Sequence, residues 1–278
     1  MVKQKNIAFD FIILIIIIIF AENLFLTLLI MRYSTMFLSV LLSMATSFVS
    51  CTMEDNGSGK ETSCPELVAW TAGATVTDDE IADFGIQRCF VSELISDSVF
   101  QVMKGKSYKD NCTVPRGDLR YVKVLHRNLK GENVLGELVC NKEIASDLLD
   151  IFRELYDARY PIERMVLIDN YNAEDDPSMI ANNSSCFNFR FVAGTTTLSN
   201  HSMGKAIDIN PLYNPYVKKR ADGSYYVSPE EGRPYADRSK NFDYKIDHND
   251  LCYKLFKKHG FTWGGDWISL KDYQHFEK

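Results

Sequence analysis

Two short segments near the C-terminal end of the chain carry the residues best suited to chemistry. The first contains His201 and Asp208, and the second contains His275. Two imidazoles and one carboxylate form a donor set for Zn²⁺, and three protein ligands leave a fourth position open for water, as in catalytic zinc sites. The sequence therefore predicts a Zn²⁺ site with the ligands His201, Asp208 and His275.

A possible general base accompanies this donor set. Asp272 precedes His275 by three residues, and a carboxylate beside an activated water can accept its proton. Residues three apart on an ideal strand face opposite ways, so a bend or turn must separate Asp272 from His275 if both face the metal. The HExxH helix of thermolysin-type proteases is absent, which excludes that class.

The segments around these residues have clear local patterns. Ile207 and Ile209 alternate with Asp208, which predicts a strand with the carboxylate on the face opposite the isoleucines. Residues 247–259 have the apolar spacing of a helix, and we expect Asp247 to cap it and Gly260 to end it. The last strand carries His275.

Further elements should support this site. Residues 121–125, 135–140 and 165–168 read as strands, and a helix with apolar residues from 144 to 156 follows Asn141 as its expected N-cap. Residues 213–245 read as a long surface excursion, such as a lid or binding loop. Helices combined with mostly antiparallel strands predict an α+β fold: one domain with a mainly antiparallel sheet flanked by helices.

The first 51 residues should not belong to this fold. Residues 7–20 are almost entirely apolar, and a second signal-like unit begins at Met31 and reaches Cys51. Either Cys51 is the lipidated first residue of a bacterial lipoprotein, or residues 7–30 anchor the chain in a membrane. Both readings place the protein in the extracytoplasmic cell envelope (periplasm or outer surface), tethered to the membrane through its N-terminus. We expect it to be a monomer. We expect a polar tether over residues 52–79 and the catalytic domain over residues 80–278.

Composition limits the classes of partner that the chain could bind and the roles that its cysteines could have. The net charge is −6 and no basic stripe stands out, which argues against nucleic acid as a partner. Six cysteines follow Cys51, so an exported chain could pair them in disulfides, or they could be small buried side chains. No CxxC pair is present, which argues against a structural zinc knuckle.

The motifs resemble a known family. Ser199-x-His201-x-x-Gly204-x-Ala206-x-Asp208 together with Asp272-x-x-His275 is similar to the VanY/VanX-type D-alanyl-D-alanine carboxypeptidase family of zinc metallopeptidases. Asn183-x-Ser185-x-Phe187-x-x-Arg190 resembles the substrate-binding stretch of that family, and residues 260–267 resemble the lead-in to its last ligand in the branch with phage endolysin L-alanyl-D-glutamate peptidases. The resemblance runs from about residue 80 to the end.

The resemblance implies a role for each matching position and a Hedgehog/DD-peptidase-like fold. His201, Asp208 and His275 match the zinc ligands, and Asp272 matches the catalytic acid/base, where many members have Glu. Arg190 matches the arginine that holds a substrate carboxylate or polarises the scissile carbonyl. Substrate contacts are implied at Ser199, Arg190 and Ser185. The expected activity is hydrolysis of D-amino-acid-containing stem peptides of peptidoglycan, either by a D,D-carboxypeptidase or by an L-alanyl-D-glutamate-type endopeptidase.

Other interpretations remain open from the residues alone. The chain could be a non-catalytic zinc-bearing module that binds envelope peptides, since a fold does not fix a function. A cysteine hydrolase using Cys186 or Cys252 lacks a recognisable Cys–His context. Arg190 could form a surface salt bridge, and Asp266 is expected to have a structural role. The remaining histidines also read as structural: His126, His248 and His259.

Overall fold

The computed structural model of the chain describes residues 64–192 and 194–278. The predicted signal or anchor segment, lipidation at Cys51 and the first part of the tether therefore lie outside the described residues. Within the described ranges, no helix is both long and apolar enough to cross a bilayer.

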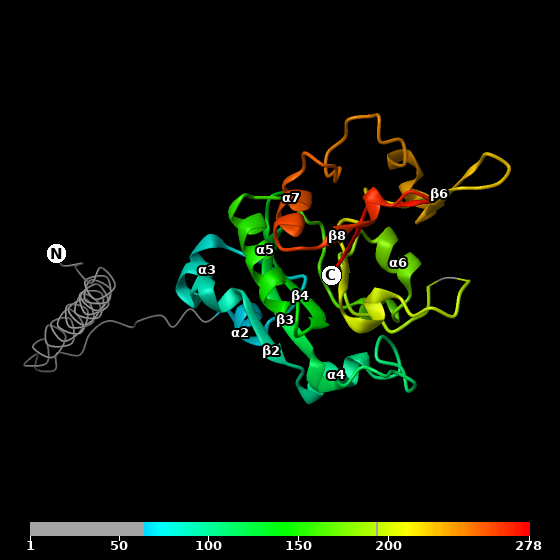
Figure 1. Cartoon of the computed structure of the whole chain (residues 1–278). Helices are drawn as coiled ribbons and strands as arrows, with labels where there is room; N and C mark the ends of the chain where they lie inside the picture. The colour runs from blue at the N-terminus through cyan, green and yellow to red at the C-terminus, as the bar shows by residue number, and fades with distance from the viewer. Residues whose placement is uncertain (1–63, 193) are drawn as a thin grey trace, which may run out of the picture. The chain divides into compact units, whose positions relative to one another are not determined.

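Helices and antiparallel strands mix along the chain, and this confirms the predicted α+β class (Figure 1). The α-helices are α2 (Pro65–Ala69), α3 (Asp78–Phe84), α4 (Asp97–Met103), α5 (Ala145–Asp157), α6 (Asp175–Ile180) and α7 (Leu251–Lys258). The strands are β1 (Thr75–Val76), β2 (Val91–Leu94), β3 (Leu119–Arg127), β4 (Asn133–Asn141), β5 (Ala206–Asp208), β6 (Tyr216–Lys219), β7 (Tyr225–Ser228), β8 (Thr262–Trp263), β9 (Lys271–Asp272) and β10 (His275–Glu277). Short 3-10 helices are η1 (Ile86–Cys89), η2 (Arg116–Asp118), η3 (Ile168–Tyr171), η4 (Asn200–Met203), η5 (Glu230–Tyr235) and η6 (Gly264–Asp266).

The largest sheet has the strand order β1-β4-β3-β2 and is antiparallel throughout. Its centre is the β3–β4 hairpin, in which Leu119 lies opposite Asn141. Helix α5 covers one face of this sheet (Figure 1). Val122 and Leu138 point toward α5, whereas Tyr121 points to a second cluster on the other face. Because both faces are covered, these strands are buried almost continuously along their length.

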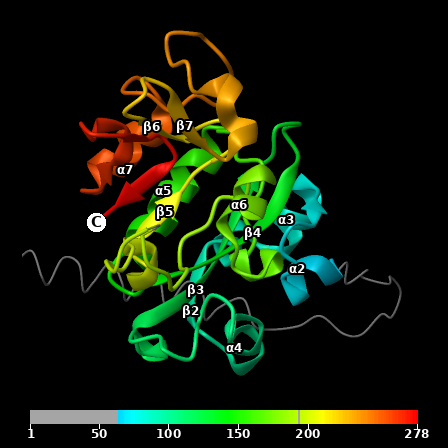
Figure 2. The same ribbon diagram turned by 90° about the vertical axis from the view of Figure 1, so that its right-hand side faces the viewer.

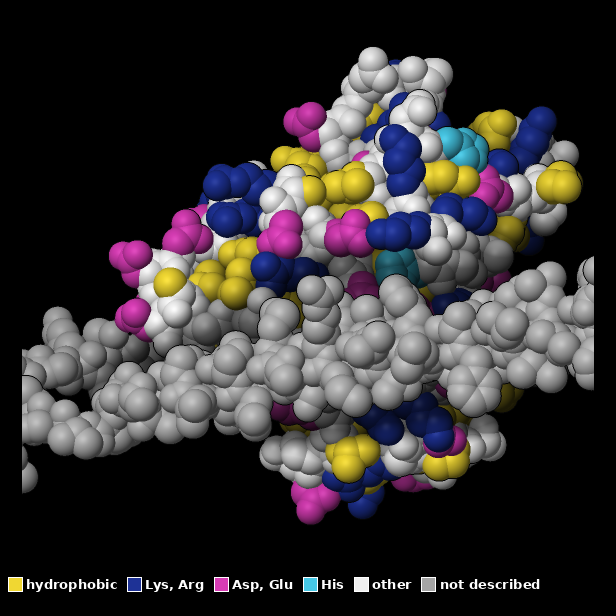
Figure 3. Space-filling model, turned by 60° about the vertical axis from the view of Figure 1, so that its left-hand side comes forward, with side chains coloured by type: hydrophobic (Ala, Val, Ile, Leu, Met, Phe, Trp, Pro, Cys, Tyr) yellow, Lys and Arg dark blue, Asp and Glu magenta, His cyan; other side chains and the backbone are white. Residues whose placement is uncertain are grey.

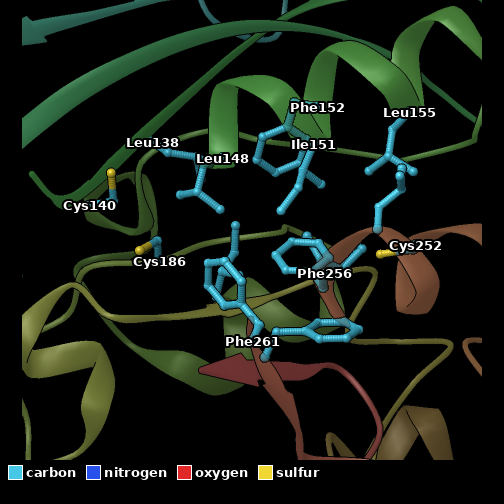
Figure 4. Packing of buried hydrophobic residues seen from close by; sticks show 14 of the residues in the cluster. Leu138, Cys140, Leu148, Ile151, Phe152, Leu155, Cys186, Cys252, Phe256 and Phe261 are labelled. Atoms are coloured by element: carbon cyan, nitrogen blue, oxygen red, sulfur yellow. The ribbon is translucent and has the colours of Figure 1, made fainter. Parts of the chain in front are cut away.

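The apolar stripe of α5 joins the central sheet to the C-terminal part of the chain. Ile151 and Phe152 of α5 face Phe256 and Phe261 across this core (Figure 4). The helix has no side-chain cap at its start: Asn141, the expected N-cap, instead accepts a hydrogen bond from Glu143 N at 3.0 Å. The predicted N-cap of α5 is therefore wrong, since the chain makes a separate turn before the helix begins.

Helix α7 begins later than its sequence pattern suggests. Asp250, not Asp247, caps it and accepts hydrogen bonds from Cys252 N and Tyr253 N at 2.8 and 3.3 Å. Asp247 instead closes a preceding turn by accepting from Asn249 N at 2.9 Å. Two aspartates three residues apart offer the same local signal, and the packing of the helix selects the second. Gly260, at φ +83°, follows the helix as expected.

Two small sheets lie in the C-terminal half, with the strand orders β5-β10-β8 and β7-β6-β9. The region 213–245, expected to be a surface excursion, contains β6, β7 and η5, so it is partly ordered into a hairpin (Figure 2). The strand expected at residues 165–168 does not form; residues 165–167 have no regular secondary structure, and η3 begins at Ile168. Pairing there is limited to an isolated bridge between Arg164 and Asn183.

The packed region begins earlier than residue 80. Leu67 and Trp70 are only 1% and 6% exposed, and β1 pairs with β4. Thr77 and Glu80 form a capping box at the start of α3. Residues 64–79 are therefore part of the folded domain, although they fall in the predicted tether. A few apolar side chains in a polar segment are enough to attach it once a sheet edge is available.

The six cysteines in the described ranges are free thiols, and Cys89, Cys140, Cys186 and Cys252 are buried. Cys140 and Cys186 belong to the apolar core shown in Figure 4, so the interpretation of small buried side chains holds for them. Outside this core, Figure 3 shows acidic and basic side chains interspersed on the visible part of one face.

Candidate metal centre and active site

Three side chains from different elements converge on one point. His201 lies in η4, Asp208 ends β5 and His275 begins β10. One ligand atom from each lies within 4.8 Å of the other two. His201 Nε2 is 3.2 Å from Asp208 Oδ2, and His275 Nδ1 is 3.1 Å from Asp208 Oδ1. The structure therefore brings together the three residues predicted as ligands.

Strand pairing places two of these ligands side by side. Asp208 and His275 are direct partners in the antiparallel β5–β10 pair. Directly opposite residues on such a pair project from the same face, so the register itself aims the carboxylate and the imidazole at a common point. Their strand neighbours Ile207 and Phe276 are fully buried on the other face, which fixes this register through the core.

A tight turn places His201 beside Asp208 and His275. Ser199 caps η4, and its Oγ accepts a hydrogen bond from His201 N at 3.3 Å. Gly204 ends the turn at φ +66°, and a Cβ there would lie 2.7 Å from Asn141 N. Only glycine suits both the left-handed backbone and this close approach. The glycine of the sequence motif thus packs the histidine turn onto the end of β4.

Hydrogen bonds assign one free nitrogen to each histidine. His201 Nδ1 lies 2.6 Å from the carbonyl oxygen of Cys186 and must donate to it, so Nε2 faces the site as an acceptor. His275 Nε2 lies 3.0 Å from Glu277 Oε2, and its Nδ1 faces Asp208. Such outer bonds fix the tautomer and orientation of metal-binding histidines.

Glu277 is a supporting residue that our sequence analysis missed. One of its carboxylate oxygens accepts from His275 Nε2 and, at 2.7 Å, from Asn200 Nδ2. Its contact with His275 could have been predicted, because residues two apart on a strand share a face. Asn200 lies 77 residues away in the sequence, so nothing local could have identified it as the second partner.

The electrostatics of the cluster favour a cation at its centre. Burial opposes the charged form of Asp208, but the neighbouring charges of His201 and His275 hold the pKa of its carboxyl well below the usual range. Burial also opposes a charged His275, yet hydrogen bonds to Asp208 and Glu277 raise its pKa to about 10. His201 Nε2 and His275 Nδ1 face each other at 3.2 Å, so a proton or a metal ion must lie between them.

This donor set fits a metal ion. Two imidazole nitrogens and a carboxylate oxygen are ligands that zinc and several other transition metals accept. The separations of 3.1 and 3.2 Å between donor atoms lie near the ~3.4 Å expected between ligands of a tetrahedral zinc ion with bonds of about 2.0–2.1 Å. His201, Asp208 and His275 would hold the ion. Within residues 64–192 and 194–278, these three residues form a group whose ligand atoms all lie within 4.8 Å of one another, as a shared metal ion requires.

Asp272 reaches the site through the expected turn. It ends β9, Tyr273 and Gln274 form the turn, and His275 opens β10. Trp263 Nε1 donates to the carbonyl oxygen of Tyr273 at 2.9 Å, which holds the turn in place. The sequence thus predicted the turn between Asp272 and His275, and in the structure Trp263 supports that turn.

The surroundings of Asp272 suit a proton acceptor. Its Oδ1 is buried and has no hydrogen-bond partner among the described residues. Burial raises the pKa of Asp272 to about 6, with opposing contributions from the charges of His275 and Asp208. Gly264 packs against it so closely that a Cβ there would lie 2.5 Å from Asp272 O and 2.8 Å from its Cβ. The carboxylate is therefore held within electrostatic reach of the cluster.

The residues expected to contact substrate have different surroundings. Ser185 exchanges backbone hydrogen bonds with Asp208, at 3.2 and 2.9 Å, and so lies directly beside a candidate ligand. Ser199 is 7% exposed, and its hydroxyl supports the backbone of His201. Arg190 Nε lies 2.6 Å from Asp175 Oδ2 of α6. The ion pair considered for Arg190 is thus formed, although this pair is partly open to solvent.

The remaining histidines have their own partners away from the cluster. His126 is buried and bonded to the carbonyl oxygen of Ile162, His248 pairs with Asp266 at 2.7 Å, and His259 pairs with Asp147 at 3.2 Å. These contacts agree with the structural roles expected for them and for Asp266.

The two cysteines considered as nucleophiles are poorly suited to that role. Both Cys186 and Cys252 are buried, and burial raises the pKa of each thiol well above its usual range. Because the thiolate is the reactive form, neither position favours nucleophilic catalysis.

Comparison with known proteins agrees with the geometry. No curated protein and no solved structure showed a significant match to the chain. Residues 193–278 match a family described as D-alanyl-D-alanine carboxypeptidase. The matched segment contains the three candidate ligands and Asp272, whereas the expected resemblance began near residue 80. The predicted resemblance is therefore confirmed over residues 193–278, the segment that matches this family.

Proposed function

We propose that the protein is a zinc-dependent peptidase that hydrolyses D-amino-acid-containing peptides of peptidoglycan. The observation that carries this proposal is the convergence of His201, Asp208 and His275 beside the buried carboxylate of Asp272. The family match over residues 193–278 supports a peptidase that acts on cell-wall peptides.

Each residue has a definite task in this scheme. A zinc ion held by the three ligands would supply Lewis acidity and an activated water. Asp272 accepts the proton of the attacking water and later donates it to the leaving amine. Its raised pKa suits both steps, because a base works best with a pKa near the operating pH.

Arg190 is proposed to hold a carboxylate or carbonyl of the substrate. Its present partner is the carboxylate of Asp175, so the guanidinium already binds the kind of group that a substrate would present. Planar guanidinium groups bind carboxylates in a bidentate manner and remain charged. We therefore expect the substrate to replace Asp175 on Arg190.

Mass spectrometry of muropeptides tests the proposal. The purified full-length chain, loaded with zinc, should shorten stem peptides, and a chelator should abolish the reaction. A loss of terminal D-alanine would identify a D,D-carboxypeptidase, whereas cleavage between L-alanine and D-glutamate would identify an endopeptidase. Intact muropeptides after treatment with the zinc-loaded protein would refute the proposal.

The Asp272→Asn variant separates an enzyme from a non-catalytic peptide-binding module. An enzyme should lose turnover but keep its zinc and its affinity for peptide, because the amide has a similar shape and cannot accept the proton. Wild-type protein that binds muropeptides with bound zinc yet releases no product would favour the binding module.

We further propose that the protein acts at the extracytoplasmic side of the envelope, tethered as a monomer through its N-terminal segment. The basis is the apolar pattern before Cys51 and the location of peptidoglycan. Mass spectrometry of the mature N-terminus would distinguish a lipidated Cys51 from a retained anchor over residues 7–30. An unprocessed chain recovered in the cytosolic fraction would contradict both.

A further inference from the structure

The β7-β6-β9 sheet has two unlike faces. Val217 and Val227 are 9% and 2% exposed and form the inner face. Tyr216 lies opposite Asp272 on one side and opposite Ser228 on the other. Because directly paired residues project from the same face, these three side chains form one row on the outer face. The catalytic carboxylate is thus the first member of that row.

The outer face continues along the hairpin. Lys218 and Tyr226 are paired and form the next row, and the rings of Tyr216 and Tyr226 are 6.0 Å apart. Burial and then the nearby charge of Asp272 raise the pKa of the Tyr216 phenol. The two tyrosines therefore extend from the candidate base toward the tip of the hairpin formed by β6 and β7.

This face combines aromatic surface with positive charge. Tyr226 is 43% exposed, and the guanidinium of Arg220 lies 5.5 Å from the centre of its ring. Lys218 is exposed, and no carboxylate of the described residues lies within 4.0 Å of its ammonium group. Aromatic rings offer a large contact area to a peptide, and an unpaired ammonium group complements a carboxylate.

We infer that Tyr216, Lys218 and Tyr226 on the outer face of the hairpin bind the substrate next to the cleaved bond, and that they select a peptide with a free carboxylate. This inference rests on the proposed peptidase function and names the surface that holds its substrate. The tyrosines contact the peptide, and Lys218 pairs with its carboxylate. None of the three residues takes part in bond cleavage.

The opposite face of the same hairpin provides matched controls. Tyr225 is 51% exposed and is paired with Lys219 on the face that Val217 and Val227 share. The variants Tyr226→Ala and Lys218→Gln can therefore be compared with Tyr225→Ala and Lys219→Gln. Each pair removes the same group from adjacent positions at similar exposure, and thermal melts of all four variants check that folding is intact.

The experiment uses the full chain loaded with zinc and a synthetic stem pentapeptide that contains both candidate bonds. Tyr226→Ala and Lys218→Gln should each raise KM about two- to tenfold, the range of single aromatic or charged contacts, with kcat unchanged. The control variants should keep the wild-type KM. A pentapeptide with amidated carboxylates should bind wild type and Lys218→Gln equally well.

A binding assay keeps this inference separate from the proposed function. Calorimetric titration of the pentapeptide into chains that also carry Asp272→Asn measures affinity without turnover. Weaker binding by the outer-face variants than by the controls supports the inference even if the wild-type chain cleaves neither bond, a result that would refute only the proposed function. Equal affinities across the four variants would overturn the inference.

Discussion

Removal of the Glu277 carboxylate should loosen the metal from its site without unfolding the protein. The carboxylate accepts from His275 Nε2 at 3.0 Å and from Asn200 Nδ2 at 2.7 Å. The hydrogen bond from His275 lowers the pKa of Glu277, so the group is ionised at neutral pH. In the Glu277→Ala variant, His275 loses the partner that fixes its tautomer and its orientation.

The expected loss of zinc affinity follows from two independent arguments. A hydrogen bond to a charged group contributes about 1.5–3 kcal/mol. Loss of an outer partner of a metal-binding histidine typically costs about 10- to 100-fold in affinity, or about 1.4–2.8 kcal/mol. Glu277→Gln keeps an acceptor oxygen but loses the charge. Because charged bonds are about twice as strong as neutral ones, its loss should be about half as large in free energy.

Competition with a chelating dye at neutral pH would measure the zinc affinity of each variant. Glu231→Ala removes a charge from an exposed position in η5 and serves as the control for net charge. Thermal melts of the metal-free proteins show whether folding is retained. A zinc affinity of Glu277→Ala within twofold of wild type would refute the view that this carboxylate orients His275.

Three further predictions concern the base and the core. Gly264→Ala would place a Cβ 2.5 Å from Asp272 O and so displace the Asp272 carboxylate. We expect kcat to fall by roughly 100-fold, as for an ångström-scale misplacement of a catalytic group, while the zinc content stays unchanged. The control Gly117→Ala, whose added Cβ meets no atom within 4 Å, should behave as wild type. Because the pKa of Asp272 is raised to about 6 and only its ionised form accepts a proton, kcat/KM should fall as pH drops below about 6, and a flat profile with zinc still bound would contradict its role as base. Phe276 is fully buried and stacks on Phe256 with ring centroids 4.3 Å apart. Phe276→Ala should therefore lower the free energy of unfolding, measured by denaturant titration, by about 3–5 kcal/mol. A loss below about 1 kcal/mol, close to the contribution of one buried methylene group, would show that the core does not hold β10.

Local patterns predicted some of the elements that carry the site and the helices that support it. Alternation around Ile207 predicted β5, and apolar spacing predicted α5 and the body of α7, because the side-chain periods of strands and helices are properties of the local chain. The need for a turn before His275 followed from the same geometry. Where two residues offered equal signals, as with Asp247 and Asp250, the local pattern selected the wrong cap.

By itself, the sequence predicted the donor set, the candidate base and the class of chemistry, since these depend on residue types within two short motifs. The tertiary structure decided how they are supported. It brought Asn200 to Glu277, paired Arg190 with Asp175, packed residues 64–79 onto the domain and aligned Tyr216 with Asp272 on one face. Each of these contacts joins segments distant in sequence. Their partners are set by strand register and core packing, which the local pattern of a single segment does not contain.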